Sequence, residues 1–456
     1  MSMIVKNPII FLPVESTPRE LDYKLHLARY FCQADFDVII GNPPFIRDEL
    51  KFKNYKGGFL EKGVNPDPQY YQAIKEKQIL LYCLSDEGAA YPAFSVTYKP
   101  AVDALKTMEH IFLWGNFQKN DLMDRNVDQE LNDKYRVIGN PGFEFSLPHY
   151  KNYHQQLKPK NLPNEYILVN TNFGAFNGFT IEENLEACSH MSPETRKMLE
   201  GCYEKEKYSF DKFYEWLTKI VSHFPNEQFL IRPHPIERKE LYQKHFSKFS
   251  NVLVSKEGNV NQIISAAKIV LHNDCTSALQ SYLMEVPVIS LAQSNIDYIH
   301  APWALSFGSL PATIEEAINQ VEYALKYKKW DPVLEISIQQ KAAETMSKMF
   351  NNLGNSSKAL SSIMISEMKE KFKNFKPYRV KDSRSLLQKL KLMVRSYLPL
   401  HYKVPVASRE AMACFSKIDL QKRLDLMKEV DGESFSYQIK KIYPNTFLIS
   451  KNSESI

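Results

Sequence analysis

Short apolar segments that alternate with segments of helical periodicity constrain the fold of this chain more than any other feature. In its first third, runs rich in Ile, Val, Leu and Phe predict strands over residues 9–12, 37–41, 78–84, 110–115 and 135–139. Apolar residues at helical spacing predict a helix over residues 19–33. Because strands that alternate with helices build parallel sheets, this part of the chain is predicted to fold as an α/β domain.

The same alternation starts again at Tyr166. Strands are predicted over residues 166–170, 228–233, 251–254, 269–272 and 286–290, and a helix over 210–224. Residues 147–165 are polar and rich in lysine and proline, so we interpret them as a linker between the two series. After Pro311 the pattern becomes helical, over residues 312–326 and 332–373.

From this order of elements we predict an α/β fold with two doubly wound, Rossmann-like domains that face each other across a cleft. The predicted parts are an N-terminal domain, a C-terminal domain and a helical, basic extension, over residues 1–160, 161–330 and 331–456.

Composition places the chain among ordinary globular proteins. Its 456 residues are 44% hydrophobic and 24% charged, which excludes a mainly disordered chain. The net charge of +5 is too small to indicate a nucleic-acid binder. None of the six cysteines forms a CxxC pair, and no apolar run reaches the roughly 18 residues that span a bilayer. We therefore expect a cytoplasmic protein that does not bind nucleic acid.

Polar residues that directly follow a predicted strand are candidates for a site, because ligands of open parallel sheets bind beyond the carboxyl ends of strands. One such segment, Ser85–Gly88, carries Asp86 and Glu87. Adjacent carboxylates at a strand end supply a nucleophile or a general base. The same pair also fits a helix cap with an acidic first turn, and its position alone leaves both interpretations open.

Three further segments follow strands of the second series. Arg232-Pro233-His234-Pro235 presents a cation and an imidazole on a backbone fixed by prolines, which suits a phosphate or carboxylate ligand and equally a rigid turn. Residues 272–278 place an aspartate and two hydroxyl groups at the start of a predicted helix, which is typical both of an anion site and of an ordinary cap. The loop at 170–177 is polar and contains a glycine that would let it approach a phosphate, and it fits a plain connecting loop as well.

Several common motifs are missing or misplaced. The chain has no GxxxxGK[ST], GxGxxG or HExxH segment, which argues against NTPase, dinucleotide-binding and zincin activity. Asp35-Phe36-Asp37 has the DxD spacing of metal-dependent glycosyltransferases, but it precedes its strand, so we interpret it as a turn between helix and strand. We therefore expect neither a metal ion nor another cofactor.

Together, the quoted segments resemble bacterial surface-carbohydrate glycosyltransferases and, more remotely, the retaining Kdo transferases of capsule and lipopolysaccharide assembly. The resemblance covers about residues 5–300 and rests on this ordered set: Pro13-Val14-Glu15, Arg19-Glu20-Leu21-Asp22, Asp86-Glu87-Gly88, Trp114-Gly115, Gly139-Asn140-Pro141, Asn170-Thr171-Asn172-Phe173, Arg232-Pro233-His234-Pro235 and His272-Asn273-Asp274-Cys275-Thr276-Ser277. It implies a GT-B fold, with the acceptor and the catalytic acid on the N-terminal domain and the donor on the C-terminal domain.

The resemblance also implies a reaction. The donor would be a CMP-activated ulosonic acid, either Kdo or a nonulosonic acid of the pseudaminic, legionaminic or sialic type. Transfer to a surface glycan would retain the anomeric configuration through a glycosylated carboxylate. Relatives carry two acids in the order Glu-Asp before a glycine, whereas this chain has Asp86-Glu87-Gly88, so we favour Glu87 as the nucleophile and keep Asp86 as the second choice. The residues predicted to bind the donor are Arg19, Asn172, Arg232, His234, His272, Asp274, Thr276 and Ser277.

Two other functions stay open: a different GT-B enzyme, which uses a UDP- or GDP-sugar or transfers a polyol phosphate, and a non-catalytic scaffold of a polysaccharide assembly complex. A separate expectation concerns residues 371–403, which hold ten Lys or Arg residues and a single acid, Asp382. Such a segment, interleaved with leucines, binds an anionic membrane surface, forms a solvated basic face or packs on its own protein. It predicts peripheral association with the inner face of the inner membrane.

Overall fold

The computed structural model describes residues 4–63, 67–84, 99–124, 128–178, 193–292, 301–397 and 414–452. The chain forms two compact units. Of the residues described, those from 4 to 145, from 346 to 397 and from 414 to 452 form the first unit, and those from 146 to 345 form the second. The chain thus leaves the first unit, builds the second and returns to the first.

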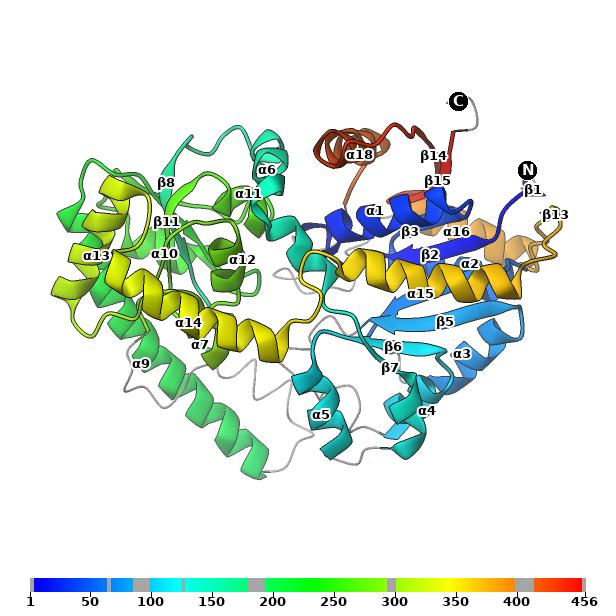
Figure 1. Ribbon diagram of the computed structural model, residues 1–456, viewed down its shortest axis with the longest axis horizontal. Coiled ribbons are helices and arrows are strands. Elements are labelled where there is room, and N and C mark those ends of the chain that lie inside the picture. Colours follow the sequence, from blue (N-terminus) through cyan, green and yellow to red (C-terminus); the bar gives the residue numbers. More distant parts are fainter. Residues whose placement is uncertain are drawn as a thin grey trace. The chain divides into compact units, whose positions relative to one another are not determined.

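Among the residues described, the first unit is built around an eight-stranded sheet in the order β14-β15-β3-β2-β4-β5-β6-β7 (Figure 1). Its parallel strands are β2 (Ile9–Pro13), β3 (Asp37–Gly41), β4 (Gly57–Lys62), β5 (Ile79–Leu84), β6 (His110–Leu113) and β7 (Tyr135–Val137). β14 (Tyr437–Tyr443) and β15 (Thr446–Lys451) extend it antiparallel beyond β3. A separate pair joins β1 (Ile4–Val5) to β13 (Tyr378–Arg379).

β2 and β4 lie side by side because Gly57 allows them to come close. A Cβ atom at Gly57 would lie 1.8 Å from the carbonyl oxygen of Ile9, so no larger residue fits without moving the strands apart. The sequence did not predict β4, since two glycines at its start obscure the apolar pattern of the strand.

Helices complete the first unit, and apolar side chains from both kinds of element form its core. The helices are α1 (Thr17–Gln33), α2 (Pro43–Phe52), α3 (Pro68–Lys75), α4 (Lys99–Lys106), α5 (Asn116–Asp124), α15 (Ser356–Lys371), α16 (Leu386–Tyr397) and α18 (Lys417–Asp431). Phe11, Phe59 and Leu81 are fully buried in this core, as a sheet with helical cover requires.

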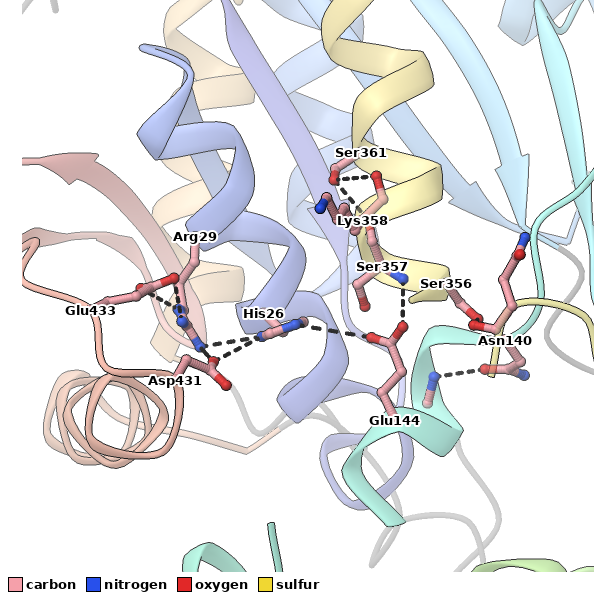
Figure 2. A network of polar contacts seen from close by, with 12 residues as sticks. His26, Arg29, Asn140, Glu144, Ser356, Ser357, Lys358, Ser361, Asp431 and Glu433 are labelled. Atoms are coloured by element: carbon pink, nitrogen blue, oxygen red, sulfur yellow. Dashed lines mark hydrogen bonds and ion pairs between the residues drawn. The ribbon is translucent and has the colours of Figure 1, made fainter. Parts of the chain in front are cut away.

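A buried polar network ties the C-terminal residues to α1 (Figure 2). Arg29 on α1 lies with its Nη1 atom 2.6 Å from Oδ2 of Asp431 and with its Nη2 atom 2.5 Å from Oε1 of Glu433. One turn earlier, Nε2 of His26 lies 4.0 Å from Oε2 of Glu144, whose other oxygen accepts a backbone N–H from the first turn of α15. Because Arg29 is buried, these acids supply the charge compensation that its guanidinium needs.

The C-terminal part of the chain therefore differs from the expectation of a helical extension over 331–456. Among the residues described, those from 346 onward belong to the first unit, and three of their segments are the strands β13, β14 and β15. β15 pairs with β3, so it covers an edge that would otherwise expose unpaired backbone groups. The boundary between the two units lies at residue 145, whereas the sequence predicted it at residue 160.

Within the described ranges, the second unit contains one five-stranded sheet in the order β10-β9-β8-β11-β12, all parallel. Its strands are β8 (Tyr166–Asn170), β9 (Phe229–Arg232), β10 (Val252–Val254), β11 (Ala267–His272) and β12 (Val288–Ser290). Its helices are α6 (Lys151–Leu157), α7 (Gly174–Asn177), α9 (Pro193–His223), α10 (Lys239–His245), α11 (Val260–Ile264), α12 (Ser277–Leu283), α13 (Ile314–Tyr327) and α14 (Pro332–Met349), the last of which ends beyond the unit boundary.

The predicted α/β class and the two Rossmann-like units are confirmed by these sheets. The predicted linker over residues 147–165 is wrong, because this segment belongs to the second unit, contains α6 and buries Tyr150, Tyr153 and His154. No helix of the described ranges is both long and apolar enough to cross a bilayer.

Candidate functional site

The strand order of the second unit marks one edge of its sheet as the place for a ligand. The chain runs outward from β8 to β9 and β10, then returns to the other side of β8 with β11 and β12. In doubly wound sheets, ligands bind where the order reverses, beyond the carboxyl ends of the strands. Here that point lies between β8 and β11, which end side by side at Asn170 and His272.

Three of the polar segments picked out in the sequence meet at this edge. Asn170 at the end of β8 is in register with Arg232 at the end of β9 on one side and with His272 on the other. The segments that follow these strands carry the other candidates of the second unit, which are Asn172, His234, Asp274, Thr276 and Ser277. Parallel pairing thus brings together residues that are far apart in the sequence.

Asp274 lies at the centre of a small cluster of amides in these loops. Its Oδ1 atom accepts a hydrogen bond from Nδ2 of Asn273 at 2.7 Å and another from Nδ2 of Asn172 at 3.3 Å. Nδ2 of Asn273 also donates to the backbone carbonyl of Asn172 at 3.3 Å. The cluster therefore joins the loop after β8 to the loop after β11.

Two buried amide oxygens of this edge have no hydrogen-bond partner in the described chain: Oδ1 of Asn170 and Oδ1 of Asn273. The amide orientation of Asn273 is fixed, since its nitrogen contacts two oxygen acceptors. A buried hydrogen-bond acceptor that lacks a donor destabilises the folded state by about 1–3 kcal/mol. Both oxygens therefore keep an unused capacity to accept a hydrogen bond.

The loop after β9 adds positive charge and a hydrogen-bond donor. Nδ1 of His234 accepts the backbone N–H of Ile236 at 3.4 Å, so the neutral ring carries its proton on Nε2. Arg232, the last residue of β9, donates from Nη2 to the carbonyl of Gly258 at 3.1 Å. Both side chains are partly exposed, and a guanidinium beside an imidazole N–H suits a phosphate.

Glu237 fixes these two loops to one another, and nothing in the sequence had singled it out. Its buried carboxylate accepts hydrogen bonds from the Thr171 hydroxyl at 2.8 Å, from the backbone N–H of His234 at 3.1 Å and from the hydroxyl of Tyr242. Burial raises the pKa of Glu237. One side chain thus holds the loop after β8 against the loop after β9.

Glu206 is a second acid that the sequence did not reveal. It projects from α9, is buried, and accepts the backbone N–H of Phe176 in the short helix α7. Burial raises the pKa of Glu206 to about 7, and the neighbouring carboxylates of Glu237 and Asp274 add to this effect. The loop after β8 is therefore held by a group that changes its charge near neutral pH.

His272, a predicted donor-binding residue, makes its hydrogen bonds within the second unit. Its ring is fully buried; Nδ1 accepts the backbone N–H of Cys275 at 3.1 Å and Nε2 lies 2.6 Å from Oγ of Ser290. Burial lowers the pKa of His272 to about 3, so the ring is neutral. With both nitrogens engaged, the ring shapes the turn that presents Asp274.

The other candidates differ in their access to a ligand. Thr276 is exposed at the start of α12, whereas Ser277 is buried and accepts a hydrogen bond from Nδ2 of Asn170 at 2.9 Å. α12 has seven residues, and Thr276 forms no side-chain cap. We therefore assign Ser277 to positioning Asn170.

Arg19 belongs to the first unit, where the strand order reverses between β2 and β4. It is exposed on the first turn of α1, next to the buried Glu20. Burial by itself would raise the pKa of Glu20. Ion pairs with Lys24 at 2.8 Å and Lys62 at 2.9 Å outweigh it and lower this pKa to about 2. Asp86 and Glu87, the predicted catalytic acids, lie outside the described residues.

In the part of the chain that the structure describes, no three His, Cys, Asp or Glu side chains are grouped so that they could hold a metal ion. The expectation that the reaction needs no metal stays a prediction.

Comparison with known proteins yields only distant structural similarity. No family model matches the chain, and no curated protein does. The UDP-GlcNAc 2-epimerase of Neisseria meningitidis bound to UDP-GlcNAc is 14% identical, with a TM-score of 0.45 over 79% of this chain and 100% of that one. A putative UDP-N-acetylglucosamine 2-epimerase of Listeria monocytogenes is 11% identical, with a TM-score of 0.45 over 80% and 98%. The wall teichoic acid polymerase TagF is 11% identical, with a TM-score of 0.43 over 80% and 90%.

Proposed function

We propose that the protein is a GT-B glycosyltransferase that moves a sugar from a nucleotide-activated donor to a bacterial surface glycan. The observation that carries this proposal is the pair of unpartnered amide oxygens, of Asn170 and Asn273, beside the carboxylate of Asp274. Three acceptor groups at one sheet edge favour a ligand with several hydroxyl or amino donors.

The neighbouring loop favours a ligand that also carries a phosphate. Arg232 ends β9, the strand next to β8, and His234 follows it, so that they supply a guanidinium and an imidazole N–H. A nucleotide sugar combines these features, since its ribose and sugar carry hydroxyl groups and its leaving group is a phosphate. The switch point of a doubly wound sheet is also a common place for nucleotides.

Within this class we propose a CMP-activated ulosonic acid as the donor, on the basis of the sequence resemblance. A CMP-sugar leaves as a single phosphate monoester, whose charge Arg232 and His234 can balance. Arg19 stays the candidate partner for the donor carboxylate. A UDP- or GDP-sugar and a polyol phosphate are the alternative substrates.

The proposed reaction proceeds by double displacement. A carboxylate oxygen of Glu87 attacks the anomeric carbon, and the bond to the phosphate oxygen breaks with both electrons going to CMP. An acceptor hydroxyl then attacks the same carbon from the other face while Asp86 takes its proton, and the carboxylate leaves. Two inversions give net retention of configuration. In the second choice, Asp86 is the nucleophile and Glu87 takes the proton of the acceptor hydroxyl.

A binding panel tests the donor class. The melting temperature of the full chain is measured with CMP, CDP-glycerol, UDP and GDP, because a ligand that binds only the folded state raises it by mass action. We expect a rise with CMP. Asp274→Asn should weaken CMP binding about tenfold, the effect of one hydrogen bond to a charged acceptor. Asp211→Asn, at an exposed aspartate of the same unit, is the matched control and should bind normally.

The other outcomes separate the alternatives. A rise with UDP or GDP but none with CMP would exclude the CMP donor and keep the transferase. A rise with CDP-glycerol alone would assign a polyol-phosphate substrate. If no nucleotide binds and no CMP-sugar is cleaved, the protein is a scaffold and the proposal is wrong.

A further inference from the structure

α16 presents an apolar face to solvent that belongs to neither the sheet nor the core of the first unit (orange in Figure 1). Leu386 is 85% exposed, Leu387 61%, Leu390 53% and Val394 50%. At 3.6 residues per turn, these four side chains project within an arc of about 100°. Such a continuous exposed strip, rather than scattered single residues, marks an interaction surface.

The base of α16 is firmly attached to the first unit. Arg384, just before the helix, is buried and donates from Nη2 to Oε1 of Glu49 at 3.0 Å. Ser385 and Gln388 then form a reciprocal cap, in which each side chain accepts the backbone N–H of the other, at 3.2 and 2.8 Å. The start of the helix is therefore fixed by contacts that do not involve its apolar strip.

Leu392 is the buried residue among the α16 side chains that the structure describes, and it orients the strip outward. Leu392 is 9% exposed and lies on the side of the helix opposite the centre of the arc, at about 190° from it by the same helical geometry. The contact made by Leu392 against the protein thus turns Leu386, Leu390 and Val394 toward solvent.

The charged residues of α16 itself are all positive. Lys389 and Lys391 are exposed and flank the apolar arc, one on each side. Residues 371–397 contain nine Lys or Arg residues and one acid, Asp382. That acid already lies 3.0 Å from Arg384, so it offers little negative charge to an approaching partner.

We propose that α16 docks the protein on an anionic lipid surface. The apolar strip would lie at the boundary between headgroups and acyl chains, and Lys389 and Lys391 would reach the lipid phosphates from either side. This inference does not depend on the proposed function, since it concerns where the protein acts and not the reaction that it catalyses.

The charge pattern favours lipid over a second copy of the chain. Two α16 helices that paired through their strips would bring the flanking lysines of one copy near those of the other, and like charges across an interface oppose association. An anionic membrane supplies both the apolar layer and the negative charge that this face lacks.

The test is flotation of the full-length protein with vesicles. We expect binding to phosphatidylcholine vesicles that contain phosphatidylglycerol at low salt, weaker binding at high salt, and little binding to pure phosphatidylcholine. Leu386→Ser with Leu390→Ser should reduce the partition coefficient at least tenfold, because two apolar side chains no longer insert. Lys389→Gln with Lys391→Gln should reduce it about 30-fold, at about fivefold per lysine near an anionic surface.

Matched control variants distinguish binding through α16 from nonspecific adsorption of the protein to vesicles. Val333→Ser with Ile336→Ser removes two exposed apolar residues from α14, and Lys328→Gln with Lys329→Gln removes two exposed lysines from the second unit. Both controls should bind like the wild type, and circular dichroism should show that every variant is folded.

Three results would overturn the proposal. The first is no binding to anionic vesicles at low salt. The second is equal losses in the α16 variants and the controls. The third is self-association that the leucine variant abolishes while vesicle binding is unchanged, which would assign the strip to a dimer.

Discussion

Glu206 provides a test of the site that needs no knowledge of the substrate. Replacing it with glutamine keeps the shape of the side chain and an oxygen that can accept the N–H of Phe176, but removes the ionisable group. The variant therefore imitates the protonated form of Glu206 at every pH. Any change in the relative stability of wild type and variant with pH reports on this one carboxyl group.

The expected magnitude follows from the shifted pKa. Burial raises the pKa of Glu206 from 4.5 to about 7, so the folded state holds its proton over a pH range in which the unfolded state has released it. A raised pKa stabilises the folded state below pH 4.5, and this stabilisation is lost as the pH rises toward 7. At about 1.4 kcal/mol per pKa unit, the wild type should lose about 2–3 kcal/mol relative to Glu206→Gln between pH 5 and pH 8.

The assay is the melting temperature of both proteins from pH 5 to pH 8. For a unit of this size, 1 kcal/mol corresponds to about 2–4 °C, so the two proteins should melt together at pH 5 and the variant several degrees higher at pH 8. Glu204→Gln, at an exposed glutamate of the same helix, is the control, and its difference from the wild type should not depend on pH. A constant difference for Glu206→Gln would refute the assignment of a buried, proton-binding carboxyl group to this position.

Three further predictions concern other parts of the chain. Glu49→Gln should lower the free energy of unfolding by about 3 kcal/mol, because the buried Glu49 contacts both Arg384 and Lys53. Glu76→Gln, at an exposed glutamate, is the control, and equal free energies of unfolding for the two variants would contradict the prediction. Burial lowers the pKa of His272 to about 3, so the stability that its neutral ring contributes above pH 6.5 is lost as the pH falls. Between pH 6.5 and pH 5, the free energy of unfolding of the wild type should therefore fall by about 2 kcal/mol relative to that of His272→Gln. A difference between the two proteins that does not change with pH would rule this out. Transfer from a CMP-sugar should change less than about twofold when EDTA is added, whereas a loss that Mg²⁺ restores would show that a metal takes part.

The sequence predicts the central strands well where an apolar run is bounded by polar or glycine residues. β3 and β8 lie at the predicted residues, because Asp37 and Gly41 bound one run and Asn170 ends the other. The same pattern fails for β4, whose Gly57 is needed for close approach to β2 and so replaces the apolar residue that would have signalled a strand.

β14 and β15 show a different reason for failure. In β14, Tyr437 and Ile439 are buried while Gln438 and Lys440 between them are exposed, which is the alternation of an edge strand. β14 pairs with β15, and β15 in turn pairs with β3, which lies near the other end of the sequence. A pairing over that distance in sequence cannot be read from local composition.

The site is only partly visible in the sequence. The loops after β8, β9 and β11 could be predicted as candidates because each follows an apolar strand. The convergence of these loops depends on strand order, which local patterns do not give. Glu206 and Glu237 could not be found at all, since the sequence does not show that the folded chain buries them.

The most direct measurement is the crystal structure of the protein with CMP bound. The account predicts ribose hydroxyl or cytosine amino groups within about 3 Å of Oδ1 of Asn273 or of the Asp274 carboxylate, with the phosphate toward Arg232 and His234. A nucleotide bound away from the ends of β8 and β11, with both amide oxygens still unpartnered, would contradict it.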